Sequence, residues 1–296
     1  MDYAVVFNTL SGRRSKKINN ALYHKLQKEL GHSIHVYEAN TLELLVVHIN
    51  EILRSDAHSL IIAGGDGTLN RVINSLLRSE CYRDINLAVL PNGTGNSFCL
   101  DLGIVDITSA IDTIKLNRLT DVRIGLIENE TENRYFINNF GIGFVYNIAA
   151  LASKMRFLGQ FSYIIATLVQ LIRLKPISFQ YSVNGVTHNE SVIFADICKS
   201  QYTGGDMLMA PSADIRKGEF QLILLKSVTR LQLLAAFPKL FRGEHLKYDF
   251  VDSIFGESIR LECQPNCHSL IDGDLAFTCP VDITIAPQKL TFYTSK

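Results

Sequence analysis

The stretch Ile61–Ile73, which reads IIAGGDGTLNRVI, decides the fold of the first part of the chain. It begins with an apolar run typical of a buried strand and continues into apolar residues spaced for one face of a helix. The segment GGDG, residues 64–67, lies between the two patterns. Glycine leaves room for a ligand to approach the backbone, and the amides at a helix N-terminus carry partial positive charge. The stretch therefore predicts a strand, a turn that can bind an anion, and a helix.

Strand and helix patterns alternate on both sides of this unit, through residues 1–122. Strand-like runs occupy residues 3–7, 33–39, 59–63 and 85–91, and amphipathic helix patterns separate them. Such a series is typical of a mostly parallel sheet with helices on both faces. We therefore predict an α/β domain over residues 1–122.

Three polar segments that contain glycine follow strands of this domain: NTLSG (8–12), GGDGT (64–68) and PNGTGN (91–96). The carboxyl ends of parallel strands share one sheet edge, where ligands bind in open α/β folds. One such segment alone indicates only a turn, because none has the P-loop lysine or the GxGxxG spacing. Together they predict a nucleotide site, with Arg13 as a phosphate ligand. Asp66 fits as a turn-former bonded to its own backbone, or as a partner of magnesium or ribose.

The second part of the chain, residues 123–287, has a different pattern. Short strand-like runs are separated by turn residues, and one helical stretch near 146–174 interrupts them. This predicts a second, mainly antiparallel β domain. The length of 296 residues also favours two domains over one. The final strand, near residues 288–296, can return to the first domain.

Composition excludes some classes of function. Lysine plus arginine equals aspartate plus glutamate, at 29 each. A net charge of zero argues against bulk electrostatic attraction to nucleic acid or to an acidic membrane, and it leaves a local basic patch open. We expect no nucleic acid as a partner. The N-terminal segment lacks the basic start of a secretory signal, and no apolar run reaches the ~20 residues of a membrane span. We expect a cytoplasmic protein.

Several further motifs, taken with these loops, extend over nearly the whole chain: GGDGTLN, LPNGTGNSF, FINNFGIGF, GGDMLMAPSADIRKG and LIDGDL. In order and spacing they resemble the diacylglycerol kinase catalytic-domain superfamily of lipid kinases, which includes sphingosine kinases. The resemblance implies an N-terminal α/β domain like that of NAD kinases and phosphofructokinases, and a C-terminal antiparallel β-sandwich, with ATP in the cleft between them. It also implies transfer of the γ-phosphate of ATP to a lipid hydroxyl, with Mg²⁺.

Two other readings stay open. One is a catalytically silent member of the family that binds ATP or lipid, and the other is a soluble enzyme similar to NAD kinase. The lipid itself cannot be read from the sequence, because apolar pockets discriminate weakly per methylene.

Carried over by position, the resemblance implies functional residues in both domains. Asp121 would position magnesium through water, and Asp274 would be the general base that accepts the hydroxyl proton. Asp274 stands where the family usually has glutamate, which is about 1.5 Å longer, so the role could move to Asp272. The ATP-binding residues, together with Arg13 and Asn96 from the loop patterns, would be Asn8, Thr9, Leu10, Ser11, Gly12, Gly64, Gly65, Asp66, Gly67, Thr68, Leu69, Asn70 and Thr94.

One loop departs from the family pattern. In PSADIRKG, residues 211–218, Lys217 stands where the family has an aspartate of a structural magnesium site. An ammonium group cannot bind magnesium, so we expect no magnesium at this loop. Lys217 could occupy the site as a built-in cation, with Asp214 as its partner.

The lipid substrate would be reached at a membrane surface. Residues 151–163 and 229–247 each combine apolar and basic side chains, as interfacial helices do, although core-facing helices show the same pattern. We expect a peripheral protein that associates transiently with membranes. The sequence does not show its oligomeric state, and a homodimer remains open.

Overall fold

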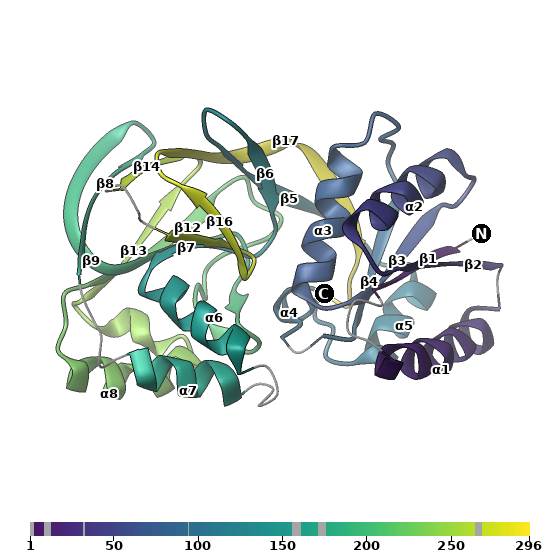
Figure 1. Cartoon of the computed structure of the whole chain (residues 1–296), viewed down its shortest axis with the longest axis horizontal. Coiled ribbons are helices and arrows are strands. Elements are labelled where there is room, and N and C mark those ends of the chain that lie inside the picture. The colour runs from purple at the N-terminus through teal and green to yellow at the C-terminus, as the bar shows by residue number, and fades with distance from the viewer. Residues whose placement is uncertain are drawn as a thin grey trace. The chain divides into compact units, whose positions relative to one another are not determined.

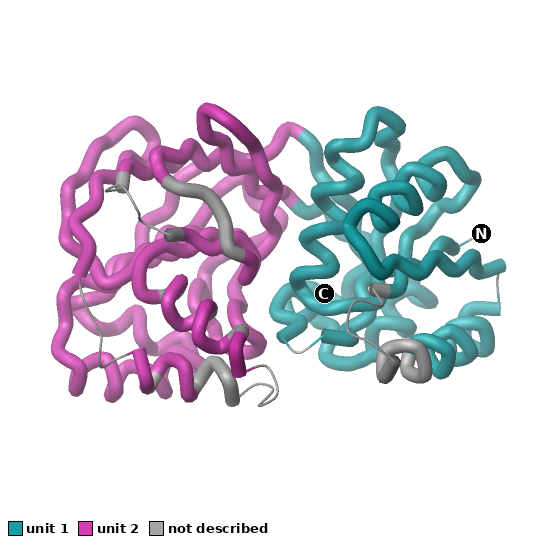
Figure 2. The backbone as a smooth tube through the Cα atoms, viewed as in Figure 1, with its two compact units in different colours: residues 1–122, 288–296 teal, residues 123–287 magenta. Residues whose placement is uncertain are grey.

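The computed structural model describes residues 3–8, 13–31, 33–93, 95–155, 161–170, 176–263 and 268–296. The chain forms two compact units (Figure 2). Unit 1 consists of residues 1–122 and 288–296, and unit 2 consists of residues 123–287. Each unit is described by itself.

Unit 1 is built on a parallel sheet in the order β2-β1-β3-β4. These strands are β1 (Tyr3–Asn8), β2 (Ile34–Ala39), β3 (Ser59–Gly64) and β4 (Asn86–Pro91). The last strand of the chain, β17 (Val281–Tyr293), pairs in parallel with β4, with Phe292 opposite Leu87. All six residues of β3 are buried, as expected for a central strand covered on both faces.

Helices cover both faces of this sheet: α1 (Arg13–Leu30), α2 (Leu42–Arg54), α3 (Asp66–Leu77), α4 (Ser97–Asp101) and α5 (Ile107–Leu116). Figure 1 shows α2 and α3 on one face and α1 and α5 on the other. Right-handed crossovers require this arrangement, since the chain reverses its direction across the sheet after β2. Local signals set some helix starts: Thr41 accepts a hydrogen bond from the amide of Leu44, and Asp106 and Ser109 form a capping box.

The strand register places the ends of β1, β3 and β4 at the same edge. Phe7 lies opposite Ala63, and Ala63 lies opposite Leu90. The segments that follow these strands therefore leave the sheet side by side. The connections that leave β1 and β3 run to opposite faces of the sheet, to α1 and α3 respectively (Figure 1). Open α/β sheets bind ligands at such a point between neighbouring strands.

Unit 2 is mainly antiparallel. Its core holds side chains from most of its strands, among them Phe136, Phe140, Tyr181, Phe220 and Leu261. The strands are β5 (Leu119–Glu128), β6 (Asn133–Phe136), β7 (Asn139–Gly143), β8 (Ile177–Val183), β9 (Val186–Cys198), β10 (Tyr202–Thr203), β11 (Met207–Leu208), β12 (Phe220–Lys226), β13 (Val251–Gly256), β14 (Ile259–Cys263), β15 (His268–Ile271) and β16 (Asp274–Thr278).

Where one helical stretch near 146–174 was expected, the structure has two helices, α6 (Phe144–Lys154) and α7 (Phe161–Gln170). Helix α8 (Arg230–Leu240) and the 3-10 helix η3 (Glu244–Lys247) follow β12. Ile148 of α6 and Leu233 of α8 pack on one cluster with Ile193 and Leu225. Among the described residues, no helix has the length and apolar character needed to cross a membrane.

Candidate functional site

The N-terminus of α3 has no side-chain cap. Its N-cap residue is Gly65, and the amides of Thr68 and Leu69 both donate to the Gly65 carbonyl at 3.0 Å. Among the described residues, the amides of Asp66 and Gly67 make no hydrogen bond. Two amide donors at the positive end of a 12-residue helix are therefore available to a ligand at the carboxyl edge of the sheet. This is a site that an anion such as phosphate can occupy.

The glycines at the start of this helix and in the neighbouring loop differ in what surrounds them. A Cβ on Gly93 would lie 2.4 Å from Gly65 Cα, and one on Gly65 would lie 2.9 Å from Gly93 Cα. The loops after β3 and β4 thus pack backbone against backbone, which only glycine permits. A Cβ on Gly67 would meet nothing within 4 Å. Gly67 therefore leaves open space directly at the uncapped amides, and no packing contact requires a glycine there.

Asp66 joins the same two loops. Its Oδ2 accepts a hydrogen bond from the Ser97 amide at 2.9 Å, and its Oδ1 accepts one from the Phe98 amide at 3.1 Å. The carboxylate therefore caps helix α4. The expectation that Asp66 bonds its own backbone is wrong, because its backbone partners are more than thirty positions away. A contact of Asp66 with magnesium or ribose stays a prediction.

Asn96, expected to bind nucleotide, has a structural role as well. It lies in the left-handed region with φ 54°, and its amide group both accepts from the Gly93 nitrogen and donates to the Gly93 oxygen at 2.9 Å. These two hydrogen bonds close the loop after β4. The side chain of Asn96 therefore holds Gly93 against Gly65.

Among the other predicted nucleotide ligands, the structure describes the side chains of Thr68, Leu69 and Asn70. Thr68 is nearly buried against Gly64, and the Leu69 side chain lies in the core of unit 1. Asn70 Oδ1 accepts a hydrogen bond from Asn74 one turn later. Thr9, Leu10, Ser11, Gly12 and Thr94 lie outside the described residues, as do the side chains of Asn8 and Arg13.

Asp121 lies on β5, and its carboxylate contacts two side chains of β17. Lys289 forms an ion pair with Oδ2, and Thr291 Oγ1 donates to Oδ1 at 2.9 Å. The hydrogen bond from Lys289, followed by that from Thr291, holds the pKa of the Asp121 carboxyl below its usual range. The group is half exposed and remains an anion. Its contact with metal-bound water stays a prediction.

In unit 2, a tight hairpin presents Asp274. Asp272 and Gly273 form the turn between β15 and β16 with φ of 48° and 87°, and Ile271 pairs with Asp274. Two consecutive residues with positive φ are the signature of a type I′ turn. Asp274 is thus the first residue of β16 and is partly buried.

The Asp272 carboxylate is buried and holds this hairpin in place. Its Oδ2 accepts from the amide of Ile137 at 2.9 Å, and its Oδ1 accepts from the amides of Asn138 and Asn139 at 2.8 and 3.0 Å. Three consecutive amide donors therefore fix the position of this carboxylate and of the turn that carries it. These contacts give Asp272 a structural role, and its action as the general base in place of Asp274 stays a prediction.

Asp196, which sequence reasoning missed, lies beneath this hairpin. It is buried in β9, and Asn139 Nδ2 donates to its Oδ1 at 2.7 Å. Asn139 thereby links Asp196 to Asp272, to which its own backbone amide donates. Burial raises the pKa of Asp196 to about 7, with a smaller contribution from the negative charge of Asp272. The sequence contains one signal for this buried carboxyl group, namely a single aspartate within the apolar run VIFADIC, residues 192–198.

The raised pKa of Asp196 predicts a pH-dependent stability. Between its unfolded value of 3.8 and about 7, the folded state keeps a proton that the unfolded state loses. The free energy of unfolding therefore falls as pH rises through this window, by on the order of 4 kcal/mol, and levels off above it. Asp196→Asn should remove this slope. Urea unfolding between pH 4 and pH 8 measures it, and an equal slope in both proteins would contradict the assignment.

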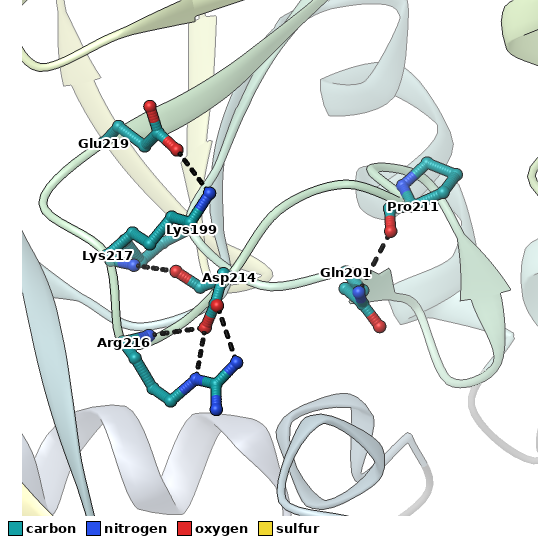
Figure 3. Close-up of polar contacts among 7 residues, drawn as sticks. All are labelled: Lys199, Gln201, Pro211, Asp214, Arg216, Lys217 and Glu219. Carbon is teal, nitrogen blue, oxygen red and sulfur yellow. Dashed lines mark hydrogen bonds and ion pairs between the residues drawn. The ribbon is translucent and has the colours of Figure 1, made fainter.

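The loop from Pro211 to Glu219 differs from expectation (Figure 3). Asp214 Oδ1 and Oδ2 accept from Nε and Nη2 of Arg216 at 2.9 and 2.8 Å, whereas Lys217 pairs with Glu219 at 3.3 Å. The expected pairing of Lys217 with Asp214 is therefore wrong. The hydrogen bond from Arg216 is the main cause that lowers the pKa of Asp214 to about 2. Among the described residues, no group of three or more acidic, histidine or cysteine side chains is arranged to hold a metal ion.

Comparisons with known proteins place the chain in a family. The family model of the diacylglycerol kinase catalytic domain matches residues 2–127. The model of the YegS C-terminal NAD kinase beta sandwich-like domain matches residues 140–294. The chain therefore belongs to the diacylglycerol kinase catalytic-domain superfamily, which is a family of lipid kinases.

Individual relatives agree with this. A diacylglycerol kinase of Mycobacterium tuberculosis is 28% identical over 271 residues, which are 82% of this chain and 84% of the relative. A solved diacylglycerol kinase from Bacillus anthracis str. Sterne matches with a TM-score of 0.71 at 17% identity, over 99% of this chain and 96% of that one. An NAD kinase from Archaeoglobus fulgidus, solved with ATP, has a TM-score of 0.55 at 13% identity, over 100% and 94%. The predicted fold class, an α/β domain like that of NAD kinases followed by a β-sandwich, is confirmed.

Proposed function

We propose that this lipid kinase transfers the γ-phosphate of ATP to the hydroxyl group of a diacylglycerol, a sphingoid base or a related lipid. The observation that carries the proposal is the N-terminus of α3. Its uncapped amides and the open space at Gly67 form an anion site at the sheet edge where open α/β folds bind ligands. Membership of a lipid kinase family supports a phosphate as that anion.

Phosphoryl transfer requires positioning, charge neutralisation and a group that accepts the hydroxyl proton. In the proposed reaction the α3 amides hold a phosphate of ATP. Mg²⁺ bound to ATP would neutralise part of the phosphate charge. Asp121, kept ionised by Lys289, would hold that ion through a water molecule. Asp274, on its fixed hairpin, takes the proton of the lipid hydroxyl.

A direct assay tests the proposal against its alternatives. Purified protein is incubated with radiolabelled ATP, magnesium and detergent-dispersed diacylglycerol, monoacylglycerol, phosphatidylglycerol, sphingosine or ceramide, and separately with NAD. A labelled lipid supports the proposal and names the substrate. Labelled NAD phosphate would instead indicate an enzyme similar to NAD kinase. ATP binding without product would indicate a silent binding protein.

Membrane docking through α8 belongs to the same proposal. Leu231 and Leu234 are 78% and 41% exposed, although both are large apolar side chains. Arg230 and Lys239 of the same helix are also exposed. The Thr229–Gln232 capping box fixes the first turn that carries Leu231. Exposed apolar side chains beside basic ones favour an anionic lipid surface as the partner.

Replacement of Leu231 and Leu234 by aspartate is therefore expected to weaken binding to anionic vesicles by at least about tenfold, because burying one such side chain contributes roughly 1.5–3 kcal/mol. Val105→Asp is the matched control, since Val105 is 75% exposed in unit 1. Flotation with vesicles of phosphatidylglycerol and phosphatidylcholine measures the binding. Equal flotation of the α8 variant and wild type would rule out this docking surface.

A further inference from the structure

Lys199 is a fully buried lysine whose charge the proposed reaction does not use. It follows β9 directly, and its side chain is 0% exposed. Its Nζ donates to the main-chain oxygen of Asp214 at 2.8 Å, and its own amide donates to the Asn138 oxygen at 2.8 Å. A buried ammonium is costly unless oxygen atoms surround it. Figure 3 shows the Lys199 ammonium beside the main chain of Asp214, to which it donates.

The start of the loop at residues 211–219 is held by two hydrogen bonds. Gln201 Nε2 donates to the Pro211 oxygen at 3.0 Å, and the Ser212 amide donates to Gln221 Oε1 at 3.1 Å. At its middle, the Ile215 oxygen accepts from the amide of Arg123 at 2.9 Å. The loop thus supports β5 two residues after Asp121.

The charges in this loop leave no place for a divalent cation. Asp214 and Glu219 are its acidic residues, and each already has a basic partner in Arg216 or Lys217. With Lys199, three positive groups face two negative ones. The charge of Lys199 also contributes to the lowered pKa of Asp214, although Arg216 is the larger cause. Magnesium prefers a shell of oxygen ligands and would be repelled here.

We infer that the Lys199 ammonium occupies the position of a bound cation in this loop, so that residues 211–219 adopt their structure without metal. The resemblance implied a structural magnesium ion at this place and suggested Lys217 as its substitute. Lys217 is 60% exposed and pairs outward with Glu219, so the internal cation is Lys199 instead. The inference concerns the stability of the loop and is independent of the proposed lipid substrate.

Thermal unfolding without nucleotide tests the inference. Wild type should have the same Tm in millimolar MgCl₂ as in EDTA. Lys199→Met should lower the Tm by at least about 4 °C, because it leaves the Asp214 carbonyl without its buried donor. Lys217→Met, the matched control, should change the Tm by less than about 1 °C, because its ion pair is exposed. If Lys199→Met is insoluble while Lys217→Met stays soluble, the loss of stability of Lys199→Met exceeds its expected lower bound of about 4 °C in Tm, which supports the inference.

A double variant extends the test. Lys199→Met combined with Lys217→Asp removes the internal cation and adds a carboxylate, so magnesium should raise the Tm of this variant but not that of wild type. Three results would overturn the inference: a wild-type Tm that rises with magnesium, a Lys199→Met effect no larger than that of Lys217→Met, or a double variant that ignores magnesium.

Discussion

Asp274→Asn is expected to lower kcat for phosphate transfer by at least about a hundredfold, while the Kd for ATP stays unchanged. Asparagine has nearly the shape of aspartate, yet it cannot accept the proton of the lipid hydroxyl, and general base catalysis contributes roughly 10²–10⁴ in rate. Asp274→Glu should remain active, because glutamate keeps the carboxylate and extends it by about 1.5 Å. Radiolabel transfer measures kcat, and titration calorimetry measures ATP binding.

The hairpin supplies the control for this experiment. Asp272→Asn removes an acceptor from the three amides at residues 137–139 and should destabilise the protein by roughly 1–3 kcal/mol. Its loss of activity should therefore follow its loss of folded protein, whereas Asp274→Asn should fold as wild type does. Wild-type turnover by Asp274→Asn would remove Asp274 from the mechanism.

Gly93→Ala and Gly67→Ala should have opposite effects on stability and the same effect on ATP binding. The Cβ that Gly93→Ala adds would meet the Gly65 backbone at 2.4 Å, so the two loops must separate, at a cost of roughly 1–3 kcal/mol. The Cβ that Gly67→Ala adds meets no atom within 4 Å, and the change removes a glycine from a helix. It should therefore stabilise the protein by up to about 1 kcal/mol.

Both variants should bind ATP at least about tenfold more weakly, since a single poor contact of about 1.4 kcal/mol has this effect. Gly93→Ala would lose affinity because the loop moves, and Gly67→Ala because its methyl group occupies the approach to the α3 amides. Urea unfolding and calorimetry separate the two reasons. If Gly67→Ala were stabilised and still bound ATP as wild type does, the α3 N-terminus would not be the nucleotide site.

The sequence was sufficient for the fold class because periodic apolar patterns report burial directly. The run SLIIA became the fully buried β3, and the segments after β1, β3 and β4 do leave from aligned strand ends. These features depend on neighbours along the chain and on the regular geometry of a parallel sheet. They do not depend on which rotamer any one side chain adopts.

Polar contacts were harder to predict for the same physical reason. Asp66 bonds amides on a different loop, and such a partner is fixed only when the backbone of both loops is in place. Asp214 had two basic residues within reach along the chain, and the fork of Arg216 matches its carboxylate better than the ammonium of Lys217. Asp196 and Lys199 are buried titratable side chains, which composition and periodicity do not reveal.

Strand β17 begins in unit 2 and ends in unit 1, which has a consequence for protein synthesis. Phe292 is fully buried against Phe98, and the hydroxyl of Tyr293 lies 2.8 Å from that of Ser59. On the ribosome, the N-terminal α/β unit therefore cannot complete its core while residues 123–287 of unit 2 are being translated. Unit 2 can close first, and the nascent α/β unit would wait, with one edge of its sheet open to chaperones, until residues 288–293 emerge.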